Sequence, residues 1–174
     1  KAIEYYERSA KLNNTIALNR LGYIYANGRI VKQNYSKAIK YYERSAKLNN
    51  TDALNHLGNH YVNGEGVERN YSKAIKYYKQ SARLNNSIAF YNLGNLYENG
   101  EGVKQDFLRA IKYYEQSAKL NNTIALNRLG YIYEIGEGVK QNYSKAIEYY
   151  ERSAKLNDSD ALNRLGTLYE NGGG

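Results

Sequence analysis

The sequence NNTIALNRLGYIY, at residues 13–25, decides the fold because it returns unchanged at residues 121–133, 108 residues later. Two edited versions, NNTDALNHLGNHY at residues 49–61 and NNSIAFYNLGNLY at residues 85–97, lie between them at equal intervals of 36 residues. A fixed period of this length is typical of stacked supersecondary units. The chain is therefore a tandem repeat.

The repeat accounts for the whole chain, because the motif [KR]AI[EK]YY returns every 36 residues. The blocks comprise residues 1–36, 37–72, 73–108, 109–144 and an incomplete fifth block, 145–174. We predict a single repeat array over 1–174. The chain begins inside an apolar periodic segment, so we expect this array to be a segment of a longer one.

Two helices are predicted in each block. Residues 36–48 place Ala38, Tyr42 and Leu48 on an apolar face and charged side chains opposite, and we name this type helix B. Residues 51–63 bury side chains such as Leu57 and form helix A. These patterns predict an all-α fold of about ten helices.

Asn and Gly mark the helix ends. Asn34 or Ser36 can cap the start of helix B, and Asn49 or Asn50 can end it. Gly58 stands inside helix A, where glycine costs about 1 kcal/mol relative to alanine. Because glycine recurs at this position in all five blocks, we expect helix B to approach too closely there for a side chain.

The composition excludes several classes. Hydrophobic residues make up 42% and charged residues 24%, as in folded globular proteins. Cysteine is absent, which removes disulfides and thiolate metal sites. No run approaches the ~20 apolar residues of a membrane span. No pattern indicates a cellular compartment.

The repeated pattern resembles Sel-one-like repeats, which are related to tetratricopeptide repeats. The resemblance implies a right-handed superhelix (solenoid) of helix pairs with A helices on the concave side, and a non-catalytic adaptor that assembles other proteins. This chain has Tyr where the family often has Trp in helix B, Asn where it has Gly after helix B, and none of the disulfides of some bacterial members. The matching residues are Ala89, Leu93, Gly94, Tyr97, Gly100, Gly102, Val103, Arg109, Ala110, Tyr113, Tyr114, Ser117 and Ala118.

The most variable positions of helix A are block positions 16, 20, 23 and 27, which form one stripe beside the buried face. Of the 21 tyrosines, only Tyr23, Tyr91 and Tyr131 fall outside the repeated positions, and all lie on this side. Tyr and Arg are common anchors of interfaces, so a protein or peptide partner is predicted here; drift at exposed positions is the alternative. The predicted partner-binding residues are Arg20, Tyr23, His56, Asn59, Tyr91, Asn92, Asn95, Arg128, Tyr131 and Arg164.

Asparagines also recur at block position 19, as Asn19, Asn55, Asn127 and Asn163. An amide offers both a donor and an acceptor, so these side chains could form a ladder for an extended peptide backbone.

Catalytic and metal sites are not predicted. His56 and His60 lie one helical turn apart, with Asp52 a turn earlier, but His60 occupies a slot that is Ile or Leu in the other blocks. We therefore expect His60 to pack at the edge of the core. GEGVK lacks the spacing of a phosphate-binding loop, so no cofactor is predicted.

The net charge of +8 raises the question of nucleic acid. Most of this charge alternates with Glu on the outer faces of the B helices, and only Arg20, Arg128 and Arg164 are basic on the stripe. A continuous basic track is missing, which argues against nucleic acid.

N-x-[ST] sequons recur in two interhelix slots. Glycosylation would explain them, but Asn as a left-handed helix end and Ser or Thr as a helix start explain the same letters, and we favour this capping interpretation. The sequons begin at Asn13, Asn34, Asn49, Asn70, Asn85, Asn121, Asn142 and Asn157.

The two ends of the chain are complementary. It opens with a B helix that has no A helix before it and closes with an A helix that has no B helix after it. Head-to-tail self-association is therefore predicted for the isolated chain, whether the array assembles naturally or has been cut from a longer one. A structural self-assembling array, exported and glycosylated, is the alternative to the binding scaffold.

Overall fold

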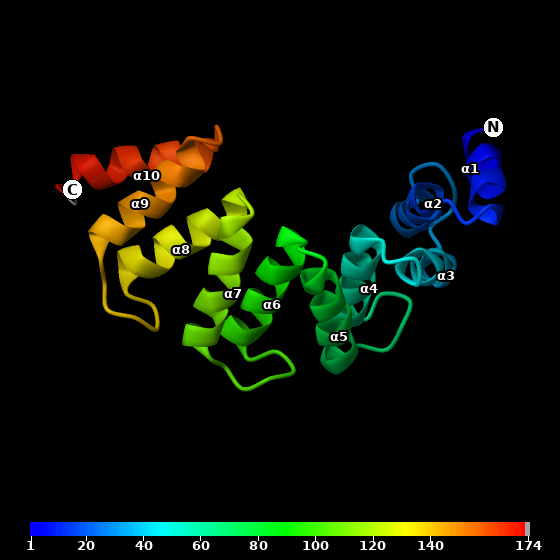
Figure 1. The fold of residues 1–174 in the computed structure, drawn as a ribbon, viewed down its shortest axis with the longest axis horizontal. Helices are drawn as coiled ribbons and strands as arrows, with labels where there is room; N and C mark the ends of the chain where they lie inside the picture. The colour runs from blue at the N-terminus through cyan, green and yellow to red at the C-terminus, as the bar shows by residue number, and fades with distance from the viewer. Residues whose placement is uncertain (173–174) are drawn as a thin grey trace. The chain divides into compact units, whose positions relative to one another are not determined.

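The computed structural model describes residues 1–172, and this part of the chain contains ten α-helices and no strand. The predicted all-α class and the number of helices are confirmed. Odd-numbered helices are of type B and even-numbered helices of type A (Figure 1). The helices are α1 (Ala2–Lys11), α2 (Thr15–Asn27), α3 (Tyr35–Ala46), α4 (Thr51–Asn63), α5 (Tyr71–Arg83), α6 (Ser87–Asn99), α7 (Phe107–Lys119), α8 (Thr123–Ile135), α9 (Tyr143–Ala154) and α10 (Ser159–Glu170).

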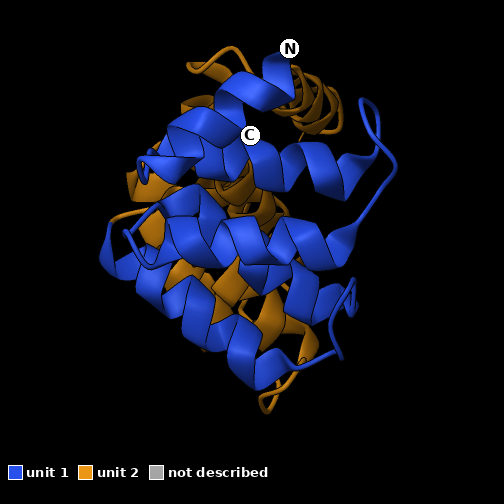
Figure 2. Ribbon diagram, turned by 90° about the vertical axis from the view of Figure 1, so that its right-hand side faces the viewer, with its two compact units in different colours: residues 1–84 blue, residues 85–174 orange. Residues whose placement is uncertain are grey.

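The chain forms two compact units, residues 1–84 with α1–α5 and residues 85–174 with α6–α10 (Figure 2). Within each unit every helix packs on the next one in the sequence. Leu18, Leu21 and Leu57 are fully buried in the first unit, and Leu126 and Leu129 in the second. Within each unit the core therefore repeats with the sequence.

Asparagine caps most of the helix starts, and Asp106 and Asp158 do so for α7 and α10. Asn34 Oδ1 accepts from the Lys37 N–H at 2.8 Å, and Asn14 Oδ1 accepts from the Ala17 N–H at 3.0 Å. The Asn34 alternative for the start of helix B is thus confirmed, and Ser36 lies inside the helix. Thr51, expected to start helix A, is its first helical residue, and the cap is the preceding Asn50.

The turn from helix B to helix A contains one left-handed residue. Asn13, Asn49, Asn85, Asn121 and Asn157 all have φ between 57° and 61°. Asparagine tolerates this conformation better than most residues, which explains its place in the repeat. The prediction that Leu48 is buried was wrong: α3 ends at Ala46, and Leu48 lies in the turn with 46% of its surface exposed.

The glycine inside helix A packs directly against a tyrosine ring of the next B helix. A Cβ atom built on Gly22 would lie 2.5 Å from Cε1 of Tyr42, well inside van der Waals contact. Gly58, Gly94 and Gly130 meet the equivalent tyrosines. The expected close approach is confirmed in these repeats, and its cause is a side chain rather than the backbone of helix B.

A buried serine joins each inner B helix to the A helix before it. The Ser hydroxyl lies near the C-terminal end of the B helix, and its partner is the carbonyl of the first A-helix residue. The bonds are Ser45 to Thr15 (3.0 Å), Ser81 to Thr51 (3.1 Å), Ser117 to Ser87 (2.7 Å) and Ser153 to Thr123 (3.5 Å).

A second repeated contact stacks two tyrosines beside a cation. The rings of Tyr25 and Tyr41 stack with centroids 5.8 Å apart, and Lys37 Nζ lies 4.1 Å from the Tyr25 centroid. The Tyr133–Tyr149 pair stacks at 5.8 Å, and Lys145 Nζ lies 4.8 Å from the Tyr133 centroid. These pairs explain why the tyrosines at block positions 5 and 25 do not vary.

Candidate partner-binding site

In the first unit the variable stripe lies on α2 and α4. Arg20 and Tyr23 are exposed on α2, and Tyr23 shows 45% of its surface. His56 on α4 is half-buried, and its ring stacks on buried Tyr42 with centroids 4.7 Å apart. Asn59 accepts a hydrogen bond from the Tyr78 hydroxyl at 2.5 Å. His56 and Asn59 therefore also support the tyrosines of the B helices.

In the second unit the stripe opens into a pocket of about 700 Å³ formed by α6, α8 and α10, with Tyr150 of α9 also in its lining. Four predicted residues line it, namely Tyr91, Arg128, Tyr131 and Arg164. Asn92 and Asn95 are half-buried on α6, outside this lining. The Tyr114 hydroxyl donates to Asn95 Oδ1 at 2.7 Å. The structure thus gathers the aromatic and basic predicted residues of this unit and leaves two amides aside.

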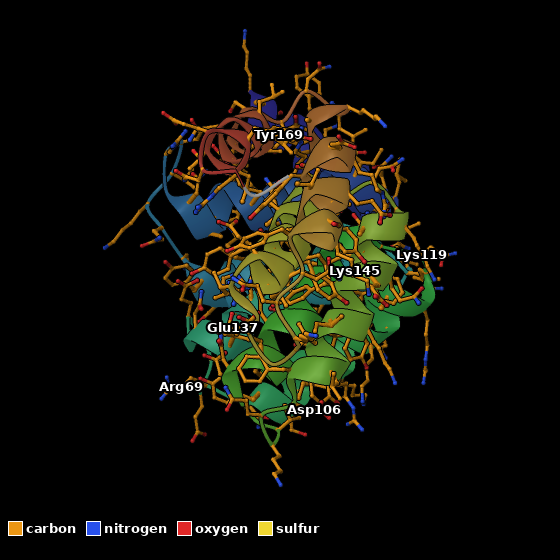
Figure 3. The ribbon with its side chains drawn as sticks, turned by 90° about the vertical axis from the view of Figure 1, so that its left-hand side faces the viewer. Arg69, Asp106, Lys119, Glu137, Lys145 and Tyr169 are labelled. Atoms are coloured by element: carbon orange, nitrogen blue, oxygen red, sulfur yellow. The ribbon has the colours of Figure 1, made fainter. Side chains whose placement is uncertain are left out.

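Arg128 is held by two carboxylates. Its Nε donates to Glu98 Oε2 at 3.1 Å, and Nη2 donates to Glu137 Oε2 at 2.8 Å and also contacts Glu98 Oε1. Glu137 lies in the loop after α8 (Figure 3). Glu98, 9% exposed, also accepts from the buried Tyr114 hydroxyl. This network fixes the guanidinium on the pocket wall, which lowers the side-chain entropy a partner would have to remove.

Tyr131 lies between two guanidinium groups. The Cζ atoms of Arg128 and Arg164 are 5.2 Å and 5.7 Å from the Tyr131 ring centroid, within the range of cation–π attraction. Arg164 is exposed on α10 and forms no carboxylate pair among the described residues. The pocket therefore presents an aromatic ring, the cation of Arg164 and the carboxylate of Asp160 beside exposed Ile124.

Near the pocket, some residues of the A helices accept a hydrogen bond from a buried tyrosine hydroxyl of the next B helix. Asn95 stands at block position 23 and accepts from Tyr114, whereas Tyr131 at the same position cannot play this role. Glu98 and Glu134 share block position 26: Glu98 accepts from Tyr114 as well, and the Tyr150 hydroxyl donates to Glu134 Oε2 at 2.7 Å. Sequence reasoning missed Glu98 and Glu134; their shared block position 26 was the available signal.

Asn127 does not present its amide as the predicted ladder requires. Its Nδ2 donates to Asp158 Oδ1 at 2.8 Å, at the start of α10, and its Oδ1 is inaccessible to solvent. Burial alone would raise the pKa of Asp158, but the hydrogen bonds from Asn127 and from the Ala161 N–H outweigh it and lower that pKa. Asn127 lines the pocket, but its amide joins two A helices and its oxygen is not open to a backbone donor.

His60 packs in the core, as expected, with 5% of its surface exposed. Its Nδ1 lies 3.0 Å from the Glu65 carbonyl oxygen, and its ring meets Tyr35 edge-on. Burial lowers the pKa of His60 and of His56. Over residues 1–172 no group of three or more His, Asp or Glu side chains could hold a metal ion. In the same range, no helix is both long and apolar enough to cross a bilayer.

The fold and the pocket define an all-α repeat array whose polar, aromatic surface lies on one helix of each pair. The Sel1 repeat profile matches residues 1–14, 15–50, 51–86, 87–122, 123–158 and 159–174. The chain belongs to the Sel1 repeat family, whose members are generally protein-interaction scaffolds and typically non-catalytic. No curated protein sequence is significantly similar to it.

Solved Sel1 structures support this assignment. A Sel1 repeat protein from Oxalobacter formigenes shares 31% identity with a TM-score of 0.87, over 96% of this chain and 68% of its own. The protective antigen c5321 of uropathogenic Escherichia coli shares 30% identity with a TM-score of 0.86, over 97% of this chain and 36% of its own. Helicobacter pylori cysteine rich protein B shares 32% identity with a TM-score of 0.60, over 74% of this chain and 92% of its own. These similarities confirm the all-α repeat superhelix as the fold class.

Proposed function

We propose that this chain is a non-catalytic scaffold that binds a protein or peptide partner on the variable surface of its A helices. The observation that carries the proposal is the pocket of about 700 Å³ on α6, α8 and α10, where four predicted residues converge. Tyr and Arg are the residue types that most often dominate interface energies.

The chemistry of the pocket favours an acidic or carboxylate-bearing segment with an apolar side chain. Arg164 offers a free guanidinium to a carboxylate, while Tyr91, Tyr131 and Ile124 offer aromatic and aliphatic surface. Arg128 is already paired with Glu98 and Glu137, so it would contact a partner as a fixed part of the pocket wall and not as an unpaired charge.

A displayed peptide library selected on the 174-residue chain tests the proposal. Selected peptides should lose about 1–3 kcal/mol of binding free energy on Tyr131→Ala or Arg164→Ala, because both side chains line the pocket. Lys119→Ala, at the exposed end of α7 (Figure 3), is the matched control. Peptides that depend on Lys119 as strongly as on Tyr131 would contradict a site on the A helices.

Self-assembly is the second candidate, favoured by one observation on α10. A Cβ built on Gly166 meets nothing within 4 Å, and Tyr169 is 55% exposed, although the inner repeats cover both positions with the next B helix (Figure 3). Tyr5 on α1, 64% exposed, holds the position that stacks on the equivalent of Tyr169 in inner repeats. A second copy could cover these positions with its own α1.

Light scattering over a concentration series tests self-assembly. The isolated chain should form concentration-dependent oligomers, and Tyr5→Glu or Tyr169→Glu should dissolve them, because either change removes one half of the stacked pair. Lys119→Glu serves as a surface-charge control. A monomer at all concentrations would refute head-to-tail contact and leave the partner-binding proposal untouched.

A further inference from the structure

A cavity of the first unit lies away from the variable stripe, between the B helices α3 and α5 over α4. Its volume is about 830 Å³, which is within the range of small-molecule sites. None of the predicted partner-binding residues lines it. It is therefore a separate feature from the surface proposed above.

The cavity exists where an arginine of the repeat has become glutamine. Arg44 Nη2 donates to the Ala10 carbonyl at 2.8 Å, and Arg152 Nη2 donates to the Ala118 carbonyl at 3.1 Å, so each arginine spans the space between two B helices. Gln80 stands at the same block position, and Gln80 and Ala46 both line the cavity. In the described part of the chain the shorter Gln80 makes no such bond, and the space stays open.

The walls of the cavity combine apolar and cationic surface. Leu54 and Leu57 form part of its lining, and the rings of Tyr61 and Tyr77 stack beside them with centroids 5.8 Å apart. Four cations and a single carboxylate contribute to the same lining, namely Lys47, Lys73, Lys76, Arg83 and Glu43. The charge balance is complementary to an anion, and the half-buried Tyr77 and the exposed Leu84 offer apolar surface to an apolar body.

We propose that this cavity binds a small amphipathic anion, an aromatic or aliphatic body that carries one carboxylate. The apolar body would lie against Tyr77 and Leu84, and the carboxylate would meet the ammonium groups of Lys47 and Lys76. Free inorganic anions lack the body, and neutral aromatic molecules lack the charge. Recognition requires both parts.

A titration with 2-naphthoate, followed by backbone amide NMR shifts, tests the site. Saturable shifts are expected in α3, α4 and α5 at the residues that line the cavity. The neutral analogue 2-naphthamide should bind about tenfold or more weakly, because it lacks the charge-assisted contacts. Phosphate alone should give no saturable shifts there. Equal binding of amide and acid, or shifts elsewhere only, would overturn the proposal.

Two exchanges of glutamine and arginine make the test specific. Gln80→Arg should restore the contact with the Ala46 carbonyl and abolish the shifts in α3–α5, whereas Gln116→Arg, the same exchange in the next block, should leave them unchanged. Conversely, Arg152→Gln should open a second and weaker site between α7 and α9, weaker because Glu148 replaces the cation of Lys76 there. Undiminished binding to a folded Gln80→Arg chain, or no new site in Arg152→Gln, would refute the proposed origin of the cavity.

Discussion

Replacing Gly130 by alanine should destabilise the chain, and the same change at Gly166 should stabilise it. Both residues occupy the same position of helix A. A Cβ on Gly130 would lie 2.6 Å from Cε1 and 2.8 Å from Cδ1 of Tyr150, whereas a Cβ on Gly166 meets nothing within 4 Å. Tyr150 has little freedom to move, because it is 1% exposed and its hydroxyl is bonded to Glu134 at 2.7 Å.

The magnitude follows from two opposing terms. Alanine is favoured over glycine inside a helix by about 1 kcal/mol, and this gain applies equally at both positions. Carbon atoms prefer separations of about 3.5–4.0 Å, so the Tyr150 ring must retreat by close to 1 Å in Gly130→Ala. Overpacking of this kind costs about 1–3 kcal/mol, so the free energies of unfolding of the two variants should differ by that amount.

Urea unfolding followed by far-UV circular dichroism provides the measurement. Gly166→Ala should raise the free energy of unfolding by about 1 kcal/mol, and Gly130→Ala should lower it by up to about 2 kcal/mol. The double variant Gly130→Ala/Tyr150→Leu is a control, since removing the ring should remove part of the penalty. A Gly130→Ala chain as stable as Gly166→Ala would refute the inference that the ring dictates the glycine.

Three further predictions concern the histidine, the turns and the sequons. Burial lowers the pKa of His60, so below pH 6.5 the unfolded chain binds a proton at this histidine that the folded chain does not bind. The stability of the fold should therefore decrease as the pH is lowered below 6.5, and it should decrease less in His60→Leu. Melting temperatures at pH 7.5 and 5.5 measure this difference. A loss as large in His60→Leu as in the wild type would contradict this. At Asn121, with φ 59°, Asn121→Gly should keep its stability while Asn121→Ala loses about 1 kcal/mol in urea unfolding; equal losses would refute the left-handed role. The sequons should be unmodified or only partly modified, so natural material of this segment should show an intact mass near 19.9 kDa, and hexose-sized additions at Asn13 or Asn34 would contradict this.

The sequence was sufficient to predict the features that depend on the 36-residue period and on local backbone preferences. The helix positions, Asn34 as a cap, the close approach at Gly58 and the burial of His60 were all accessible, because each compares one slot across blocks or follows from backbone preference. The prediction that Leu48 is buried was wrong because its helix ends two residues earlier, and periodicity alone defines helix ends poorly.

The features that could not be predicted from the sequence depend on contacts between side chains of different helices. The bond from the Tyr114 hydroxyl to Asn95 and the bond from the Tyr150 hydroxyl to Glu134 join residues 19 and 16 positions apart on different helices. The Tyr114 hydroxyl also bonds to Glu98, at the same block position as Glu134, but Ala26 and Val62 hold that position in the first two blocks, so the repeat pattern alone does not reveal the pairing. The α3–α5 cavity could not be predicted for a similar reason. The role of Gln80 is visible only when the structure shows that Arg152, at the same block position, bridges two B helices.

The serine hydroxyl that joins each inner B helix to the preceding A helix has a consequence for how such a gene can change length. Ser45 reaches Thr15 and Ser81 reaches Thr51 across the same number of residues, so any in-frame duplication of one period supplies both the donor and the acceptor of the new joint. A duplicated segment would arrive with its own core and its own connection to its neighbours. The identical stretches at residues 13–25 and 121–133 lie three whole periods apart, so they occupy the same place in their joints although the two versions between them differ.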